Sequence, residues 1–213
     1  MSSLATLRAN IRKDLHDEDA TAFRWTDDVL DRHIDRALRE YSQVSPVEVK
    51  STLTTVADSR DVQLDNLVEP IRVVAAEYPI DEYPPSFVPF SVWGQTLTLD
   101  LAAAPSGAPF VNVWWHKAHG TTGNGSFPVA HDDIIVGGAA AFAALEWASF
   151  ASNRLNVGGD DVWGRYMDFG NVRLRAFQQA LRDLPEANRL RSGRFYVPQT
   201  ARFSSQSTDP GPV

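Results

Sequence analysis

Apolar residues near the start of the chain recur at spacings of three and four, the period of a helix. Leu4, Leu7, Ile11 and Leu15 place one apolar stripe along a short helix. Ser2 or Ser3 can cap its first turn, because a serine hydroxyl accepts a hydrogen bond from a free backbone N–H. The polar run at 16–19 marks its end.

A second helix has a sharper start. Thr26 is typical of a helix N-cap, and Asp27 and Asp28 follow where negative charge is favoured by the helix dipole. An apolar stripe continues for about three turns, with charged residues mostly on the other faces, and Pro46 sets the limit of the helix. The stripe consists of Leu30, Ile34, Ala37, Leu38 and Tyr41.

From about residue 50 the period changes to two, which predicts short antiparallel strands. The clearest hairpin joins 90–93 to 96–99 through the turn Gly94-Gln95. Further strands are expected at 71–78 and 110–115, and Trp114 and Trp115 must then point to opposite faces. The proline-rich residues 79–89 belong in a loop or on a sheet edge. Four to six strands are expected, in one small sheet.

Helical spacing returns near residue 130, in a segment rich in small residues. We expect Gly137 and Gly138 to allow close packing of a neighbouring helix, since glycine in a helix costs about 1 kcal/mol relative to alanine. A last helix follows, antiparallel to this one, and its pattern ends at Pro185. Its expected buried stripe contains Trp163, Met167, Gly170, Leu174, Phe177 and Leu181.

These elements predict an α+β fold, a mainly helical bundle with an inserted antiparallel β subdomain. Two N-terminal helices and a C-terminal helical hairpin form the bundle, residues 1–49 and 127–185. The β-rich insertion is 50–126, and residues 186–213 form an extended C-terminal arm. We expect the arm to be disordered until a partner binds, because its end is polar and rich in serine and proline.

Composition and charge narrow the classes of function. The 213 residues are 43% hydrophobic and 22% charged and include no cysteine, which removes disulfides and thiolate chemistry. We find no apolar run near the length of a membrane span and no signal peptide, and expect a protein that stays in the cytoplasm, without a membrane. Seven arginines against three carboxylates make residues 173–213 basic, although the whole chain carries −7. An acidic body does not favour tight binding of DNA.

Candidate chemistry is sparse. His116, His119, His131 and Asp132 are scattered possible metal ligands without the spacing of a known site, and a structural role is favoured. Pairs of carboxylates at 132–133 and 160–161 fit helix starts, and a third pair is at 81–82. No nucleophile elbow, phosphate loop or dinucleotide motif is present. We therefore predict no enzyme, no catalytic residue, no metal and no cofactor.

Two segments resemble the head-tail connector, or adaptor, proteins of tailed bacteriophages. One begins at residue 7, contains Trp25-Thr26-Asp27-Asp28 and continues through Ile34-Asp35-Arg36-Ala37-Leu38 to Ser42. The other is 137–148, followed by Asn153-Arg154 and a second helix ending in arginines. The resemblance covers most of residues 4–185. The β insertion is larger than in minimal adaptors.

The resemblance implies a structural virion protein of the phage neck, assembled in the host cytoplasm. It would form a homo-oligomeric ring, usually of about twelve subunits, that docks on the portal protein and meets the next neck or tail protein, a stopper or tail terminator. DNA would pass through the channel without sequence-specific binding. The implied portal-docking residues in the arm are Arg189, Arg191, Arg194, Phe195 and Tyr196. A different neck or tail-completion protein, and less so a ligand-binding module, stay open as alternatives.

Overall fold

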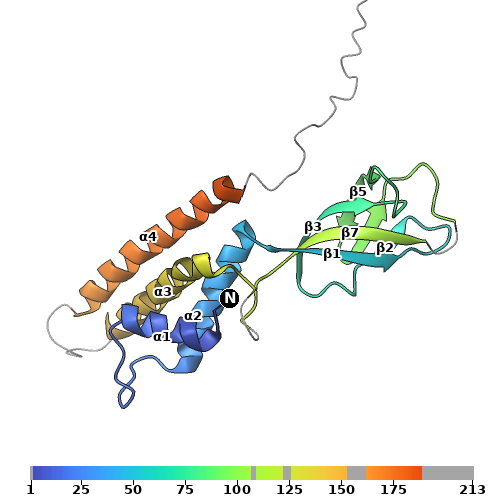
Figure 1. Cartoon of the computed structure of the whole chain (residues 1–213). Helices are drawn as coiled ribbons and strands as arrows, with labels where there is room; N and C mark the ends of the chain where they lie inside the picture. Colours follow the sequence, from blue (N-terminus) through green and yellow to red (C-terminus); the bar gives the residue numbers. More distant parts are fainter. Residues whose placement is uncertain (1, 107–108, 122–125, 153–161, 189–213) are drawn as a thin grey trace, which may run out of the picture.

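The chain folds into two parts, a group of helices and a pair of β-sheets, seen in a computed structural model (Figure 1). The structure describes residues 2–106, 109–121, 126–152 and 162–188. The helices come from both ends of the described chain and the strands from its middle. The predicted α+β class, with an antiparallel β insertion, is confirmed.

The two N-terminal helices begin at the predicted caps. Helix α1 (Leu4–Asp14) starts after Ser3, whose hydroxyl accepts a hydrogen bond from the N–H of Thr6 at 3.2 Å. Helix α2 (Asp27–Val44) starts after Thr26, whose hydroxyl accepts from the N–H of Val29, and it ends two residues before Pro46. Local capping chemistry therefore fixes both starts.

Helix α3 (Asp132–Ser152) is the centre of the helical part. It packs against α1, α2 and the antiparallel helix α4 (Val162–Asn188), as Figure 1 shows. A single 3-10 turn, Val129–His131, precedes it. All its alanines except Ala151 near its end are fully buried, as are the main apolar side chains of α1 and α2. The core therefore closes around one helix that has no polar face in its middle turns.

Residues 129–151 correct one expectation from the sequence. By length and composition alone this helix is apolar enough to cross a membrane, although no such window was expected. In the fold 61% of the window is buried inside the protein, against the other helices. A central core helix and a membrane span both need apolar residues on all sides, so composition does not separate them.

Small residues bring α3 and α4 together, but only one of the two predicted glycines does so. A Cβ on Gly138 would lie 2.8 Å from the Phe177 ring of α4, whereas a Cβ on Gly137 would meet nothing within 4 Å. Gly170 of α4 marks a second close approach of the two helices, because a Cβ at this position would lie 2.7 Å from the Leu145 side chain of α3. The packing explanation is confirmed for Gly138 and wrong for Gly137.

Helix α4 differs from its prediction in two ways. Trp163 was placed on the buried stripe but is 48% exposed, because Tyr166 and Phe169 turn toward the core instead. The helix also continues through Pro185 to Asn188, three residues past the expected end. Proline removes one helical hydrogen bond and its ring crowds the carbonyl four residues earlier, which is why an end at Pro185 was predicted.

Within the described residues, seven strands form two sheets, where one sheet of four to six strands was predicted. The first has the order β1 (Val47–Thr54), β7 (Phe110–Lys117), β3 (Pro70–Glu77) and β4 (Phe87–Val88). The second has the order β2 (Asp61–Gln63), β6 (Thr96–Leu99) and β5 (Phe90–Trp93). The predicted 90–99 hairpin is confirmed, and Gly94 at its turn has φ +59°.

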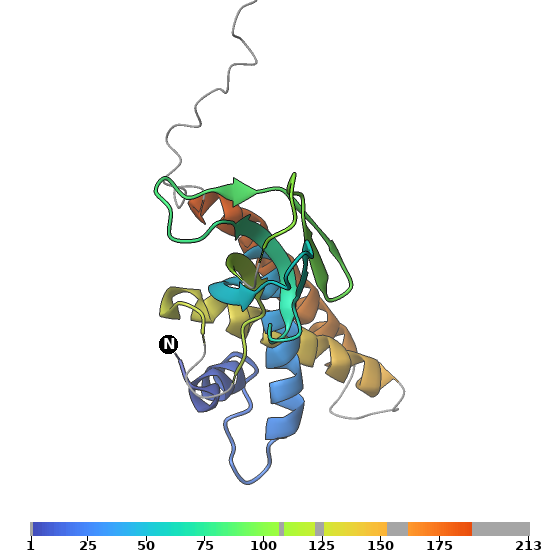
Figure 2. The ribbon, with the colours of Figure 1, turned by 90° about the vertical axis from the view of Figure 1, so that its right-hand side faces the viewer.

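The two sheets share one core, separate from that of the helices. Leu97 and Leu99 of β6 pack with Val111 and Val113 of β7, and all four are fully buried. Only the chain before β1 and the segment after β7 connect the helices to the sheets (Figures 1 and 2). The result is an elongated molecule with the helices at one end and the sheets at the other.

Candidate functional site

The predicted docking residues of the arm lie outside the described residues. Arg189, Arg191, Arg194, Phe195 and Tyr196 all follow Asn188, the last described position. Their role therefore stays a prediction. Within the described chain, a large recess lined by charged and aromatic side chains lies on the helical part.

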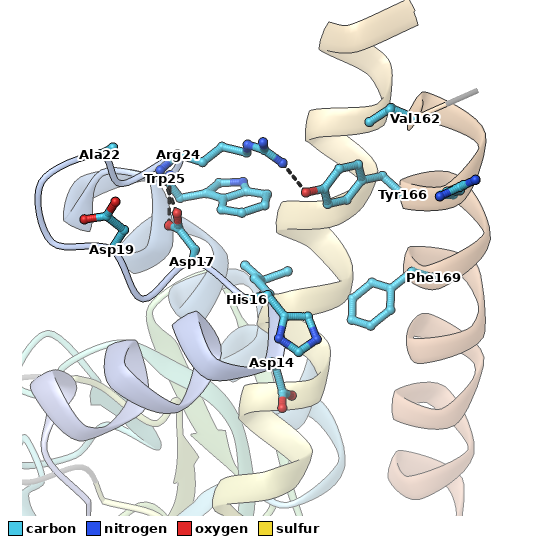
Figure 3. A pocket seen from close by; sticks show the side chains of 12 residues that line it. Asp14, His16, Asp17, Asp19, Ala22, Arg24, Trp25, Val162, Tyr166 and Phe169 are labelled. Atoms are coloured by element: carbon cyan, nitrogen blue, oxygen red, sulfur yellow. Dashed lines mark hydrogen bonds between the residues drawn. The ribbon is translucent and has the colours of Figure 1, made fainter. Parts of the chain in front are cut away.

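This recess, which we call the α1–α4 cleft, has a volume of about 540 Å³. It lies between the loop that joins α1 to α2 and the first turns of α4 (Figure 3). One wall is formed by Val162, Arg165, Tyr166 and Phe169 of α4, and the other by residues of the loop. Asp14 closes α1, and the loop residues are Leu15, His16, Asp17, Asp19, Ala22, Arg24 and Trp25.

A buried ion pair holds the loop in shape. The guanidinium of Arg12 donates to the Asp17 carboxylate at 2.8 Å, and both side chains are less than one tenth exposed. The other Asp17 oxygen accepts from the backbone N–H of Arg24 at 2.7 Å, and the N–H of Trp25 lies 3.2 Å from the carboxylate. A buried carboxylate is stable only with such partners, so the loop wraps around Asp17.

Aromatic rings surround the guanidinium of Arg24 at the mouth of the cleft. Its central carbon lies 4.7 Å from the ring centre of Trp147, 5.4 Å from that of Tyr166 and 5.8 Å from that of Trp25. The guanidinium also donates to the Tyr166 hydroxyl, drawn as a dashed line in Figure 3. Cation–π attraction of this kind orients an arginine without neutralising its charge.

The three rings pack on one another as well. Trp25 meets both Trp147 and Tyr166 edge-on, at centroid distances of 5.9 and 6.1 Å, and its Nε1 donates to the carbonyl of Ala143 at 3.3 Å. Edge-on ring pairs add roughly 0.5–1.5 kcal/mol beyond their buried area. The cleft wall is therefore rigid and prepared before any partner binds.

Most carboxylates in the cleft already have partners. Asp14 pairs with Arg173 at 2.7 Å, and Asp17 pairs with Arg12. Hydrogen bonds from the hydroxyl and the N–H of Thr21 lower the pKa of Asp19, which stays ionised.

The arginines that line the cleft differ from its carboxylates in lacking an ion-pair partner among the described residues. Among the described residues, no carboxylate lies within ion-pair distance of Arg24 or Arg165. This set of groups suits a ligand that combines a negative charge with an apolar or aromatic part.

The first sheet carries a second, smaller recess on the face away from the β core. It measures about 240 Å³, and Val74, Phe87 and Trp114 line it. Phe87 and Trp114 meet edge-on at 5.4 Å, and the Lys50 ammonium lies 4.9 Å from the centre of the Trp114 ring. Trp115 points into the β core and is 5% exposed, which confirms the prediction of opposite faces for the tryptophan pair.

The histidines considered as metal ligands have other contacts. His119 bonds to the carbonyl of Ser45 and to the Ser126 hydroxyl, each at 2.8 Å, and His131 bonds to the Tyr41 hydroxyl at 2.6 Å. His116 accepts from Arg72 at 3.0 Å, if its Nδ1 is unprotonated, and burial, followed by the Arg72 charge, lowers the pKa of His116. In the described parts of the chain, no three potential ligands gather into a metal site.

The described pairs of carboxylates lie at a helix start and on a surface loop. Asp132 and Asp133 occupy the first turn of α3, as predicted. Asp132 accepts a hydrogen bond from the hydroxyl of Ser2, which ties the N-terminus to α3. Asp81 and Glu82 lie on an exposed loop. The pair at 160–161 lies outside the described residues.

Reasoning from the sequence missed the Arg24 cluster and the cleft. The neighbouring Arg24 and Trp25 stand just before a strong helix cap, which is the only local signal. Trp147 and Tyr166 come from segments more than a hundred residues away and join them only in the folded chain. Compared with known proteins, the chain matches no protein-family model and no curated protein.

Proposed function

We propose that this protein is a structural head-to-tail adaptor of a tailed bacteriophage. It forms a ring that docks on the portal and connects the DNA-filled head to the tail, and it has no catalytic role. Its partners are the portal protein, a stopper or tail terminator, and other copies of itself. It belongs to the neck of the virion and assembles in the host cytoplasm.

The observation that carries the proposal is the pairing of the two adaptor-like segments. The segment around Trp25-Thr26-Asp27 and the segment 137–148 are far apart in the sequence, yet they pack into one core. Trp25 bonds to the carbonyl of Ala143 inside the second segment. The two segments that carry the resemblance therefore contribute to the same helical core.

Exposed aromatic residues favour a protein that assembles with partners over one that acts as a monomer. Trp93 is 81% exposed on the sheets, and Trp163 and Phe150 are exposed on the helical hairpin. Large rings cost free energy in water and are favoured anchors of protein interfaces. Both ends of the molecule therefore offer surface to partners.

Charge placement suits the same role. Residues 173–213 carry seven arginines against three carboxylates, whereas the remainder of the chain is strongly acidic. A basic arm favours an acidic docking surface, and an acidic body repels DNA phosphates, so that DNA slides past without adhering.

The decisive experiment measures the mass of the protein alone and mixed with the portal protein of the same phage, by native mass spectrometry. We expect a ring in the presence of the portal. A protein that stays monomeric and does not bind the portal would refute the adaptor role and favour another neck component or a ligand-binding module.

A truncation locates the docking segment. Removal of residues 189–213, which leaves α4 complete, is expected to abolish portal binding and to preserve the helical circular dichroism. A full-length variant with the five predicted docking residues changed to serine is the matched control for chain length, and it is expected to lose portal binding too. Normal portal affinity in both variants would refute the docking role of the arm.

A further inference from the structure

We infer that the loop 79–86 of one copy inserts Tyr83 into the α1–α4 cleft of a second copy, forming a head-to-tail contact between subunits. The inference deepens the proposed ring and rests on it for its biological role. The contact itself follows from the shapes and charges of two surfaces of this chain.

The loop 79–86 presents an unusually open aromatic residue. Tyr83 is 97% exposed, and its neighbours Asp81 and Glu82 are exposed as well. A backbone hydrogen bond from Tyr78 to Ser86 at 3.0 Å closes the base of the loop, just before β4. Proline at 79 and 84 fixes two backbone φ angles, so the loop loses little freedom when it docks.

The α1–α4 cleft complements this loop in shape. A recess of about 540 Å³ accommodates a phenol ring between the aromatic side chains of Trp25, Tyr166 and Phe169. A tyrosine buries roughly 150–250 Å² in such a site, and its hydroxyl keeps a polar edge toward the mouth. The rigid cluster around Arg24 holds the cleft open in the isolated chain.

The charges complement one another as well. Asp81 and Glu82 flank the tyrosine with two negative charges, and Arg24 and Arg165 border the cleft with two positive ones. Of the cleft carboxylates, only Asp19 lacks an arginine partner among the described residues. The attraction therefore exceeds the repulsion at this contact.

Geometry requires that the two surfaces belong to different copies. The cleft is on the helical part, and the loop follows β3, which runs away from the helices: Pro70 at its start pairs with Lys117 beside the junction, and Glu77 at its end pairs with Asn112. Figure 1 shows the helices and the sheets at opposite ends of the molecule. Two different patches that bind head to tail produce a ring when the rotation closes.

The test uses chemical cross-linking, for which the chain is well suited because it has no cysteine. Pro85→Cys places a thiol beside Tyr83 and keeps the tyrosine and both acids, and Ala22→Cys places one on the rim of the cleft. The two variants are mixed and treated with a short bismaleimide. Val172→Cys on α4, 60% exposed and outside the cleft, replaces either partner as the control for random collision.

We expect the mixed Pro85→Cys and Ala22→Cys product to exceed both control pairs by about tenfold, because docking raises the effective concentration of the two thiols. Tyr83→Ala in the Pro85→Cys chain is expected to remove the excess while keeping the thiol. Glu82→Arg is expected to reduce the product, and Arg165→Glu in the cleft partner to restore it. Yields equal to the control pairs would overturn the inference.

The outcome is separate from that of the adaptor proposal. A portal-dependent ring whose cross-linking shows no excess refutes the loop-to-cleft contact and leaves the adaptor role in place. An excess that Tyr83→Ala removes, in a protein that never binds portal, supports the contact and refutes the adaptor role.

Discussion

Gly137 and Gly138 are neighbours in one helix and are expected to respond to alanine in opposite directions. Alanine is favoured over glycine in a helix by about 1 kcal/mol, so both substitutions gain the same propensity term. Only Gly138 faces another helix closely. The difference between the two variants therefore isolates the packing of α3 against α4.

The structure sets the size of the penalty at Gly138. A Cβ there would lie 2.8 Å from Cδ2 and Cε2 of Phe177 and 3.0 Å from its Cγ, well inside the carbon contact distance of about 3.5–4.0 Å. Phe177 is 3% exposed and its ring meets Phe142 edge-on at 6.0 Å, so it has little space to move. Overpacking of this kind costs about 1–3 kcal/mol.

We therefore expect Gly137→Ala to stabilise the protein by about 1 kcal/mol. Gly138→Ala should change stability by between about 0 and −2 kcal/mol after the propensity gain, and Gly138→Leu should lose more. The free energy of unfolding is measured by urea titration, followed by far-ultraviolet circular dichroism, with equal slopes as the check that the unfolded states match. A Gly138→Ala variant as stable as Gly137→Ala would refute the close packing at this position.

Three further substitutions or conditions test the loop, the sheet and the histidines. Asp17→Ala is expected to cost about 3 kcal/mol in urea unfolding, because among the described residues it leaves the buried Arg12 guanidinium with only the exposed Asp27 as an ion-pair partner. A loss below about 0.5 kcal/mol, the usual effect of a surface substitution, would contradict the role of the ion pair. Asn112→Ala is expected to cost about 1–3 kcal/mol, because the buried Glu77 carboxylate of β3 loses the hydrogen bond that Asn112 donates to it at 2.9 Å. The substitution is expected to alter tryptophan fluorescence more than helical circular dichroism. Equal changes in both signals would contradict separate cores. Stability is expected to fall as the pH drops below about 6.5, because burial lowers the pKa of three histidines in the folded chain and the unfolded chain then binds more protons. The three histidines are His33, His116 and His119. An unfolding free energy that stays constant as the pH falls would contradict this prediction.

The sequence by itself determined the elements whose causes are local. Ser3 and Thr26 cap the helices that follow them, and Gly94 permits the tight turn of the β5–β6 hairpin. Each feature depends on bonds and torsion angles within a few residues, so a linear pattern contains the necessary information. The α+β class follows from the order of such elements.

Only the tertiary structure decided which faces and segments meet. The pairing of β1 with β7 joins strands about sixty residues apart, and it divides the strands into two sheets that no local pattern separates. Gly137 and Gly138 are identical in sequence terms, and only the position of Phe177 distinguishes them. The same is true of Trp163, which periodicity places in the core and the fold leaves exposed.

The α1–α4 cleft depends on the fold for the same reason. Its loop wraps around Asp17 through local bonds, but the rings that enclose Arg24 come from α3 and α4. Periodicity states which side of a helix is apolar and not which neighbour covers it, because hydrophobic attraction is non-directional. Shape and close packing then select the partner, and these exist only once the chain has folded.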